Sequence, residues 1–208
     1  MDDMMNLDGS GWDESMFDDV LGEVAEKVRL LVFIVDCSGS MEGTTIGSVN
    51  SIMEEVLSDL EKDKDYKRIA VLTYGKEVTW MCEPPVEFKD YGGWQRLHVS
   101  ALSHLGDAAR ELGKKLRQKE WCPSGKNGTE GVFVLFSDGM ATDQCEDGLK
   151  FLQESPIFRN GKRIAVNFSE FRDMDVLTAF TGNRENVLNL KSNEKSKAQK
   201  RILEIARN

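Results

Sequence analysis

Two acidic residues and two serines follow short apolar runs in this sequence, and together they have the chemistry of a metal site. Asp36, Ser38 and Ser40 form an Asp-x-Ser-x-Ser pattern directly after one apolar run, and Asp138 directly follows the Ser that ends another. Carboxylate and hydroxyl oxygens suit a hard divalent cation, Mg²⁺ or Mn²⁺, better than zinc or copper. Because hydroxyls add no charge, an ion held in this way stays electrophilic. It then favours a further carboxylate ligand from another molecule.

Strands and helices that alternate along the chain must position these residues. Short apolar runs predict strands buried on both faces, at 30–35, 69–72, 132–136 and 164–166. Apolar residues spaced by three and four predict helices, at about 46–60, 105–116, 148–154 and 195–206. This alternation favours an α/β fold with a parallel sheet covered on both faces. A β-rich stretch through Val78 and Trp80 follows the second strand, and we expect Pro84 and Pro85 to end it.

In a sheet of this kind, ligands bind in the crevice outside the carboxyl ends of the strands. Asp36 and Asp138 each come at the end of a predicted buried strand. We therefore expect both carboxylates and the two serine hydroxyls to face one crevice.

The acidity of the chain belongs to its first residues. The 208 residues include 36 Asp and Glu against 27 Lys and Arg, and nine of the acids but none of the bases lie in 1–26. The remainder is formally neutral, so we expect no nucleic-acid partner. Without a long apolar run or a secretory signal, we expect no membrane association. Four widely spaced cysteines favour free thiols and a cytoplasmic protein.

We divide the chain into an acidic N-terminal arm, 1–26, and one domain, 27–208. Apolar residues of the arm lie on one helical stripe and acids fill the other face, which predicts an amphipathic helix. That helix packs on its own domain or frays, or it docks into a partner's groove. The basic stretch 191–208 offers a third possibility, in which the two ends of the chain pair.

The Asp36 loop resembles the metal-ion-dependent adhesion site (MIDAS) of von Willebrand factor type A (VWA) domains, which is written Asp-x-Ser-x-Ser, then a Thr, then an Asp. Asp36, Ser38 and Ser40 match the first element, and Asp138 matches the last. Ser103, just ahead of a Leu-Gly-x-Ala helix start, stands at the Thr position; Ser100 is a weaker candidate. The resemblance implies a three-layer Rossmann-like fold. Its central, mostly parallel six-stranded sheet carries one short antiparallel strand, about 77–80, near an edge.

The resemblance also implies a function. It implies a non-enzymatic, metal-dependent protein-interaction module whose Mg²⁺ or Mn²⁺ binds an Asp or Glu of a protein partner. The stretches 138–143 and 180–183 resemble the small bacterial TerY-like branch, which is related to tellurite resistance. That branch implies a stress-response system with a kinase or phosphatase as partner. The implied metal ligands are Asp36, Ser38, Ser40, Ser103 and Asp138.

Other functions remain open at this stage. A strand that ends in Asp also resembles the nucleophile strand of a metal-dependent phosphatase, but the second acid that such enzymes use is replaced here by Ser38. The acidic arm is itself a candidate docking or scaffold element, and its carboxylates are candidate ligands for the metal. Cys37 is expected to be a small buried filler. Trp94 is a candidate to flank the crevice as part of a recognition loop.

Overall fold

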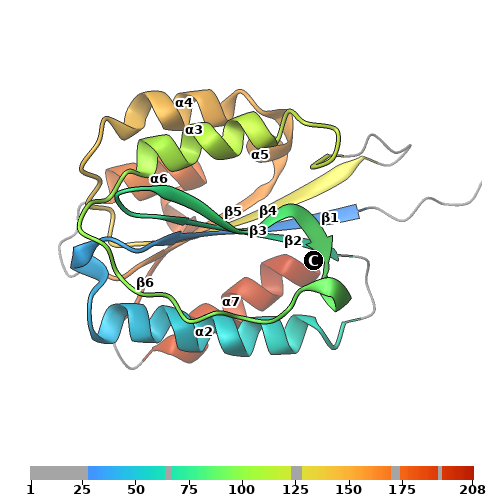
Figure 1. Cartoon of the computed structure of the whole chain (residues 1–208), viewed down its shortest axis with the longest axis horizontal. Coiled ribbons are helices and arrows are strands. Elements are labelled where there is room, and N and C mark those ends of the chain that lie inside the picture. The colour runs from blue at the N-terminus through green and yellow to red at the C-terminus, as the bar shows by residue number, and fades with distance from the viewer. Residues whose placement is uncertain (1–27, 64–66, 123–127, 170–173, 192–193) are drawn as a thin grey trace, which may run out of the picture.

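The computed structural model describes residues 28–63, 67–122, 128–169, 174–191 and 194–208. The acidic arm predicted at 1–26 lies outside these residues, as does its pairing with the C-terminal stretch. In the part of the chain that is described, a sheet of six strands runs through the centre in the order β3-β2-β1-β4-β5-β6 (Figure 1). The strands are β1 (Val28–Asp36), β2 (Lys67–Tyr74), β3 (Val78–Glu87), β4 (Thr129–Ser137), β5 (Lys162–Asn167) and β6 (Val187–Asn189).

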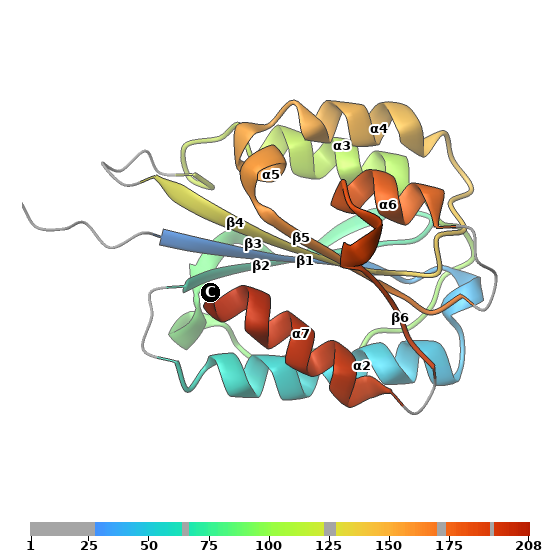
Figure 2. The ribbon, with the colours of Figure 1, turned by 180° about the vertical axis from the view of Figure 1, so that it is seen from behind.

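Helices cover both faces of this sheet, which gives three layers (Figures 1 and 2). One face is covered by α3 (Leu105–Lys115), α4 (Cys145–Gln153), α5 (Pro156–Asn160) and α6 (Asp175–Thr181). The other is covered by α2 (Thr44–Leu60) and α7 (Lys195–Arg207). Three short 3-10 turns complete the described elements: η1 (Gly39–Met41), η2 (Phe88–Asp90) and η3 (Arg184–Asn186). The predicted three-layer, mostly parallel α/β fold is confirmed.

The two cores follow from the alternation of side chains along the central strands. Leu30, Val32 and Ile34 of β1 pack in the core beneath α3 and α4, whereas Leu31 and Phe33 pack in the core beneath α2 and α7. β1 lies between β2 and β4 and pairs in parallel with both. A strand that is covered on both faces needs apolar residues at every position, which explains the continuous run.

The antiparallel strand was correctly expected at an edge, but its predicted length is wrong. β3 pairs with β2 and continues past Pro84 and Pro85 to Glu87. The register between the two strands shifts between Ile69 and Val71, where the prolines occupy an irregular stretch of the outer strand. An edge strand tolerates proline at such a bulge, because the missing N–H is not needed for a second neighbour.

Two smaller findings concern the cysteines and the helices. All four cysteines are free thiols, as expected. Within the described ranges, no helix has the length and apolar character that a membrane crossing requires.

A partly buried cluster of ion pairs around Asp63 joins the segment after α2 to the start of β2 and the end of α7. Lys67 is only 3 % exposed, and its ammonium donates to Asp63 at 2.9 Å. Arg207 Nε donates to the same carboxylate at 3.1 Å. Burial alone would raise the pKa of Asp63, but the hydrogen bonds from Arg207 and Lys67 bring it below its ordinary value.

We expect Asp63→Asn to lower the free energy of unfolding by about 1–2 kcal/mol at pH 7, because hydrogen bonds to a charged group are lost. A carboxyl whose pKa is lowered by folding stabilises above its unfolded pKa of about 3.9 and loses that contribution as the pH falls through the folded value. The deficit should therefore shrink below about pH 4. Urea unfolding of the wild type and the variant, from pH 7 to below about pH 4, measures this deficit. The exposed control Asp147→Asn should change stability by less than about 0.5 kcal/mol; equal effects of the two variants would contradict the assignment.

Candidate metal centre

The carboxylate of Asp36 lies at the centre of the candidate site. Asp36 ends β1 and is fully buried. Its Oδ1 accepts a hydrogen bond from the backbone N–H of Ser38 at 2.8 Å. Its Oδ2 accepts from the hydroxyls of Ser103 at 3.1 Å and Ser137 at 3.0 Å. Three segments that are distant in sequence therefore converge on one side chain.

The other predicted ligands lie around this carboxylate. Ser38 is buried and Ser40 is exposed, and their hydroxyl oxygens are 3.1 Å apart. Asp138 follows β4, the parallel neighbour of β1, and is 6 % exposed. Its Oδ1 accepts from the backbone N–H of Met140 at 3.0 Å. The structure thus brings the sequence-predicted oxygen donors to one edge of the sheet, where the ends of two central strands meet.

The loop before α3 presents Ser103, not Ser100, to the site. The backbone N–H of Ser103 donates to Thr142 Oγ1 at 3.0 Å, and the backbone N–H of Thr142 donates back to Ser103 O at 2.8 Å. Asp143 accepts from the first turn of α3, at the N–H of Asp107. The hydroxyl of Ser100 instead accepts from the backbone N–H of Lys76 at 3.2 Å. Ser103 is therefore held in place by the same loop that carries Asp138.

Close packing of two helices supports this arrangement. A Cβ on Gly148 of α4 would lie 2.1 Å from the carbonyl oxygen of Gly106 in α3, so the two backbones approach as closely as glycine allows. The loops that precede both helices carry Ser103 and Asp138. The contact between α3 and α4 therefore helps to hold these two loops side by side.

The two carboxylates of the site have no cationic partner among the described residues. Burial raises the pKa of Asp36; hydrogen bonds from Ser38 oppose this, and the negative charge of Asp138 raises the pKa further. Among the residues that the structure describes, no Lys, Arg or His forms an ion pair with either carboxylate. Buried charges in proteins are normally paired with an opposite charge or coordinate a metal.

The donor set also indicates which metals fit. No cluster of three or more His, Cys, Asp and Glu side chains occurs in the described part of the chain. Two carboxylates and three hydroxyls supply oxygen donors only, which suits Mg²⁺ or Mn²⁺ and not zinc. The Cys37 thiol does not alter this assignment, because burial, and then the charge of Asp36, raise its pKa to about 12.

Two neighbours of the site were not identified from the sequence. Ser137 donates to Asp36, and its oxygen also accepts from the N–H of Gly139 at 3.0 Å. Tyr74 is buried and pairs in register with Asp36 across the parallel strands; burial, and then the charge of Asp36, raise its pKa well above the ordinary value. The signal for Ser137 was its place immediately before Asp138. Tyr74 could be found only once the strand register was known.

Trp94 does not belong to this centre. Its indole N–H donates to Asn50 Oδ1 in α2 at 3.0 Å, and the ring lines a groove beside that helix. The expectation that Trp94 flanks the metal crevice is therefore wrong. The loop that carries it is attached to the side of α2 and does not place its indole at the strand ends.

Comparisons with known proteins give a consistent family. The model of the von Willebrand factor type A domain matches residues 31–201. A von Willebrand factor type A protein from Catenulispora acidiphila superimposes with a TM-score of 0.66 at 17 % identity, covering 87 % of this chain and 43 % of that one. Proximal thread matrix protein 1 of the mussel byssus gives 0.66 at 14 %, covering 87 % and 46 %.

The pilus adhesin SpaC of Lactobacillus rhamnosus GG superimposes with a TM-score of 0.64 at 11 % identity, covering 87 % of this chain and 30 % of its own. The chain thus spans less than half the length of these three structures. At such low identities these superpositions show a shared fold alone. A search of curated proteins returns no significant match.

We expect Asp138→Asn to reveal the charge imbalance of the centre. In EDTA the variant should be more stable than the wild type by about 1 kcal/mol, because one of two neighbouring buried charges is removed while the amide oxygen still accepts from Met140. Mg²⁺ at ten times its Kd should stabilise the wild type by about 1.4 kcal/mol and the variant much less.

Thermal unfolding in EDTA and in Mg²⁺ makes this measurement, with Asp147→Asn as the exposed control. A wild-type Tm that is insensitive to both Mg²⁺ and Mn²⁺, or a variant that responds as the wild type does, would show that the site holds no such ion.

Proposed function

We propose a metal-dependent, non-enzymatic interaction role for this chain, which belongs to the von Willebrand factor type A domain family. That domain is a module known for protein interaction and adhesion. In our proposal, Asp36, Ser38, Ser40, Ser103 and Asp138 hold Mg²⁺ or Mn²⁺. The bound ion supplies an open coordination position for an Asp or Glu carboxylate of a protein partner.

The observation that carries this proposal is the buried pair of carboxylates without a described cationic partner. Three hydrogen bonds fix the orientation of the Asp36 carboxylate, so this side chain needs little rearrangement to bind a metal ion. Asp138 lies at the same sheet edge and is nearly buried. Serine hydroxyls complete an oxygen donor set without adding negative charge, which leaves the ion able to attract an external carboxylate.

The same geometry argues against phosphatase chemistry. A phosphatase of the type considered above needs a second acid close to the nucleophile, to protonate the leaving group. The corresponding side chain is Ser38, whose hydroxyl lies 3.1 Å from that of Ser40. We therefore propose that the domain binds and does not turn over a substrate.

We further propose the biological setting that the TerY-like stretches suggest. The segments 138–143 and 180–183 support a cytoplasmic role in a bacterial stress response of the tellurite-resistance type, with a kinase or phosphatase as the partner. In the structure, the first of these segments is the loop that holds Ser103. The part that resembles this branch therefore also builds the proposed metal centre.

Affinity capture from the host lysate tests this function. We expect the full-length wild type to retain a partner in Mg²⁺ and to release it in EDTA. Asp36→Ala should lose at least about 90 % of the captured partner, because a tenfold loss corresponds to only 1.4 kcal/mol. Asp138→Asn, which keeps its backbone hydrogen bond, serves as a second variant if Asp36→Ala fails to fold.

Capture that survives EDTA and both substitutions would overturn the metal-bridged mechanism and would favour the acidic arm as the docking element. Sustained hydrolysis of p-nitrophenyl phosphate, abolished by Asp36→Ala, would instead establish an enzyme.

A further inference from the structure

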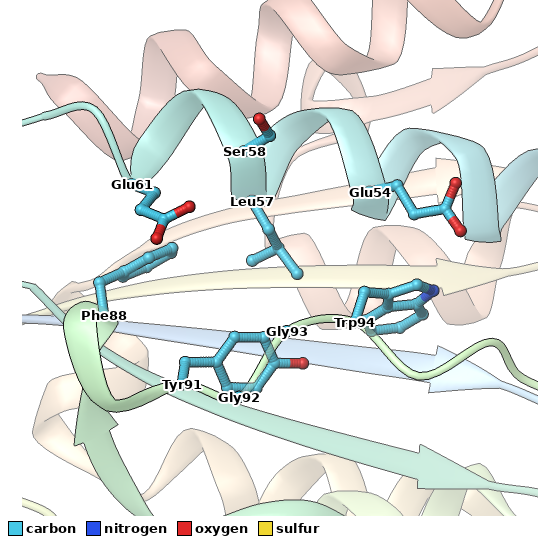
Figure 3. Close-up of a pocket in the computed structure, with 9 residues that line it drawn as sticks. All are labelled: Glu54, Leu57, Ser58, Glu61, Phe88, Tyr91, Gly92, Gly93 and Trp94. Carbon is cyan, nitrogen blue, oxygen red and sulfur yellow. The ribbon is translucent and has the colours of Figure 1, made fainter.

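A groove lies between α2 and the segment 88–94, away from the metal centre (Figure 3). Its volume is about 540 Å³, within the usual range of ligand sites. None of its lining residues belongs to the metal centre. The groove is lined by Glu54, Leu57, Ser58, Glu61, Phe88, Tyr91, Gly92, Gly93 and Trp94.

The groove combines an apolar floor with carboxylates at its ends. Leu57 points from α2 into the space between the helix and the segment (Figure 3). Glu61 lies beside Phe88 at one end, and Glu54 lies beside Trp94 at the other (Figure 3). An aromatic face next to a carboxylate is the combination that attracts a cationic side chain, through its ring quadrupole and its charge.

The wall opposite α2 is held in position by Asn50. This buried side chain accepts hydrogen bonds from Trp94 Nε1 at 3.0 Å and from the backbone N–H of Leu97 at 2.9 Å. Its amide group donates to Leu97 O at 3.3 Å. The aromatic wall is therefore built before any ligand arrives, which lowers the entropic cost of binding.

One end of the groove already accepts a guanidinium from the chain itself. Arg96 Nε donates to Glu54 at 3.0 Å, in a pair whose two side chains are largely exposed. At the other end, Glu61 forms no ion pair with any residue that the structure describes. The neighbouring Lys62 and Lys89 bond to Asp59 and Glu87. These side chains do not neutralise Glu61.

The position of Glu61 in the helix strengthens its attraction for a cation. Glu61 is the C-cap of α2, and the last turn of that helix carries no basic residue. The C-terminal end of a helix carries partial negative charge, which a carboxylate at this position increases. Arg207 Nη2 already donates to the carbonyl of Asp59 in this turn at 3.3 Å, so a positive charge supplied from outside would act on the Glu61 carboxylate itself.

We propose that this groove binds an arginine or lysine side chain from an extended basic segment of a partner protein. The charged group lies between Glu61 and the rings of Phe88 and Tyr91, and its aliphatic stem packs on Leu57. This site shares no residue with the metal centre. It binds a positively charged group, whereas the metal would bind a carboxylate, so its occupancy does not depend on Mg²⁺.

Titration of the ¹⁵N-labelled full-length chain in EDTA tests the proposal, with acetyl-Gly-Arg-Gly-Arg-Gly-amide as the probe. We expect saturable shifts of the backbone N–H signals of Phe88 and Tyr91, the two aromatic residues that flank the proposed site. Glu61→Gln should weaken binding about five-fold, because the carboxylate charge is lost while the rings of Phe88 and Tyr91 remain. Glu61→Lys should abolish the shifts.

Glu55→Gln is the matched control, because Glu55 is an exposed carboxylate on the same helix that does not line the groove. It should leave the affinity unchanged, and the same peptide with Glu in place of Arg should produce no shifts. Equal weakening by Glu61→Gln and Glu55→Gln, or shifts that spare Phe88 and Tyr91, would overturn the proposal. Because EDTA removes any divalent metal, peptide binding in this titration does not involve the metal centre. A failure of the titration would leave the metal-bridged function untouched, and a failure of the metal-bridged function would leave the groove proposal untouched.

Discussion

A carboxylate that is removed from water must be compensated by hydrogen bonds or by positive charge, and Asp36 is such a carboxylate at the end of a central strand. Its compensation comes from the backbone N–H of Ser38 and from the hydroxyls of Ser103 and Ser137, which lie in three different segments of the chain. The loops at this sheet edge are therefore connected through one side chain. Their hydrogen bonds offset burial but bring no positive charge to Asp36 or to the neighbouring Asp138. This lack of positive charge is the physical basis of the proposal that the site binds a divalent cation.

Much of the layout could be predicted from sequence because its signals are local. The strand over 30–35 is continuous in apolar residues because it is buried on both faces, and α2 shows spacings of three and four because it covers one core with one stripe. Edge elements carry weaker signals. β3 continues past Pro84 because an outer strand can bulge, and β6 has only three residues in which no period can be seen.

The candidate site shows the same division between local and long-range information. Asp36, Ser38 and Ser40 lie in one short pattern, so their proximity follows from the sequence itself. Ser137 bonds to Asp36, and Tyr74 lies beside Asp36, because of strand register, which the sequence does not state. The interpretation of Trp94 failed for a related reason. Its loop is positioned by Asn50, a buried polar residue of a helix 44 positions earlier.

The segment from Trp94 to Ser100 joins the groove to the candidate metal centre along the side of α2 (Figure 1). At one end Asn50 holds Trp94, and at the other the backbone N–H of Ser100 donates to the carbonyl of Cys37, inside the Asp36 loop. Thermodynamic linkage makes any communication along such a connection reciprocal. A basic segment that alters the affinity for the metal by some factor must have its own affinity altered by that same factor. A partner that carries both a basic and an acidic segment would then bind the domain cooperatively, at two sites that prefer opposite charges.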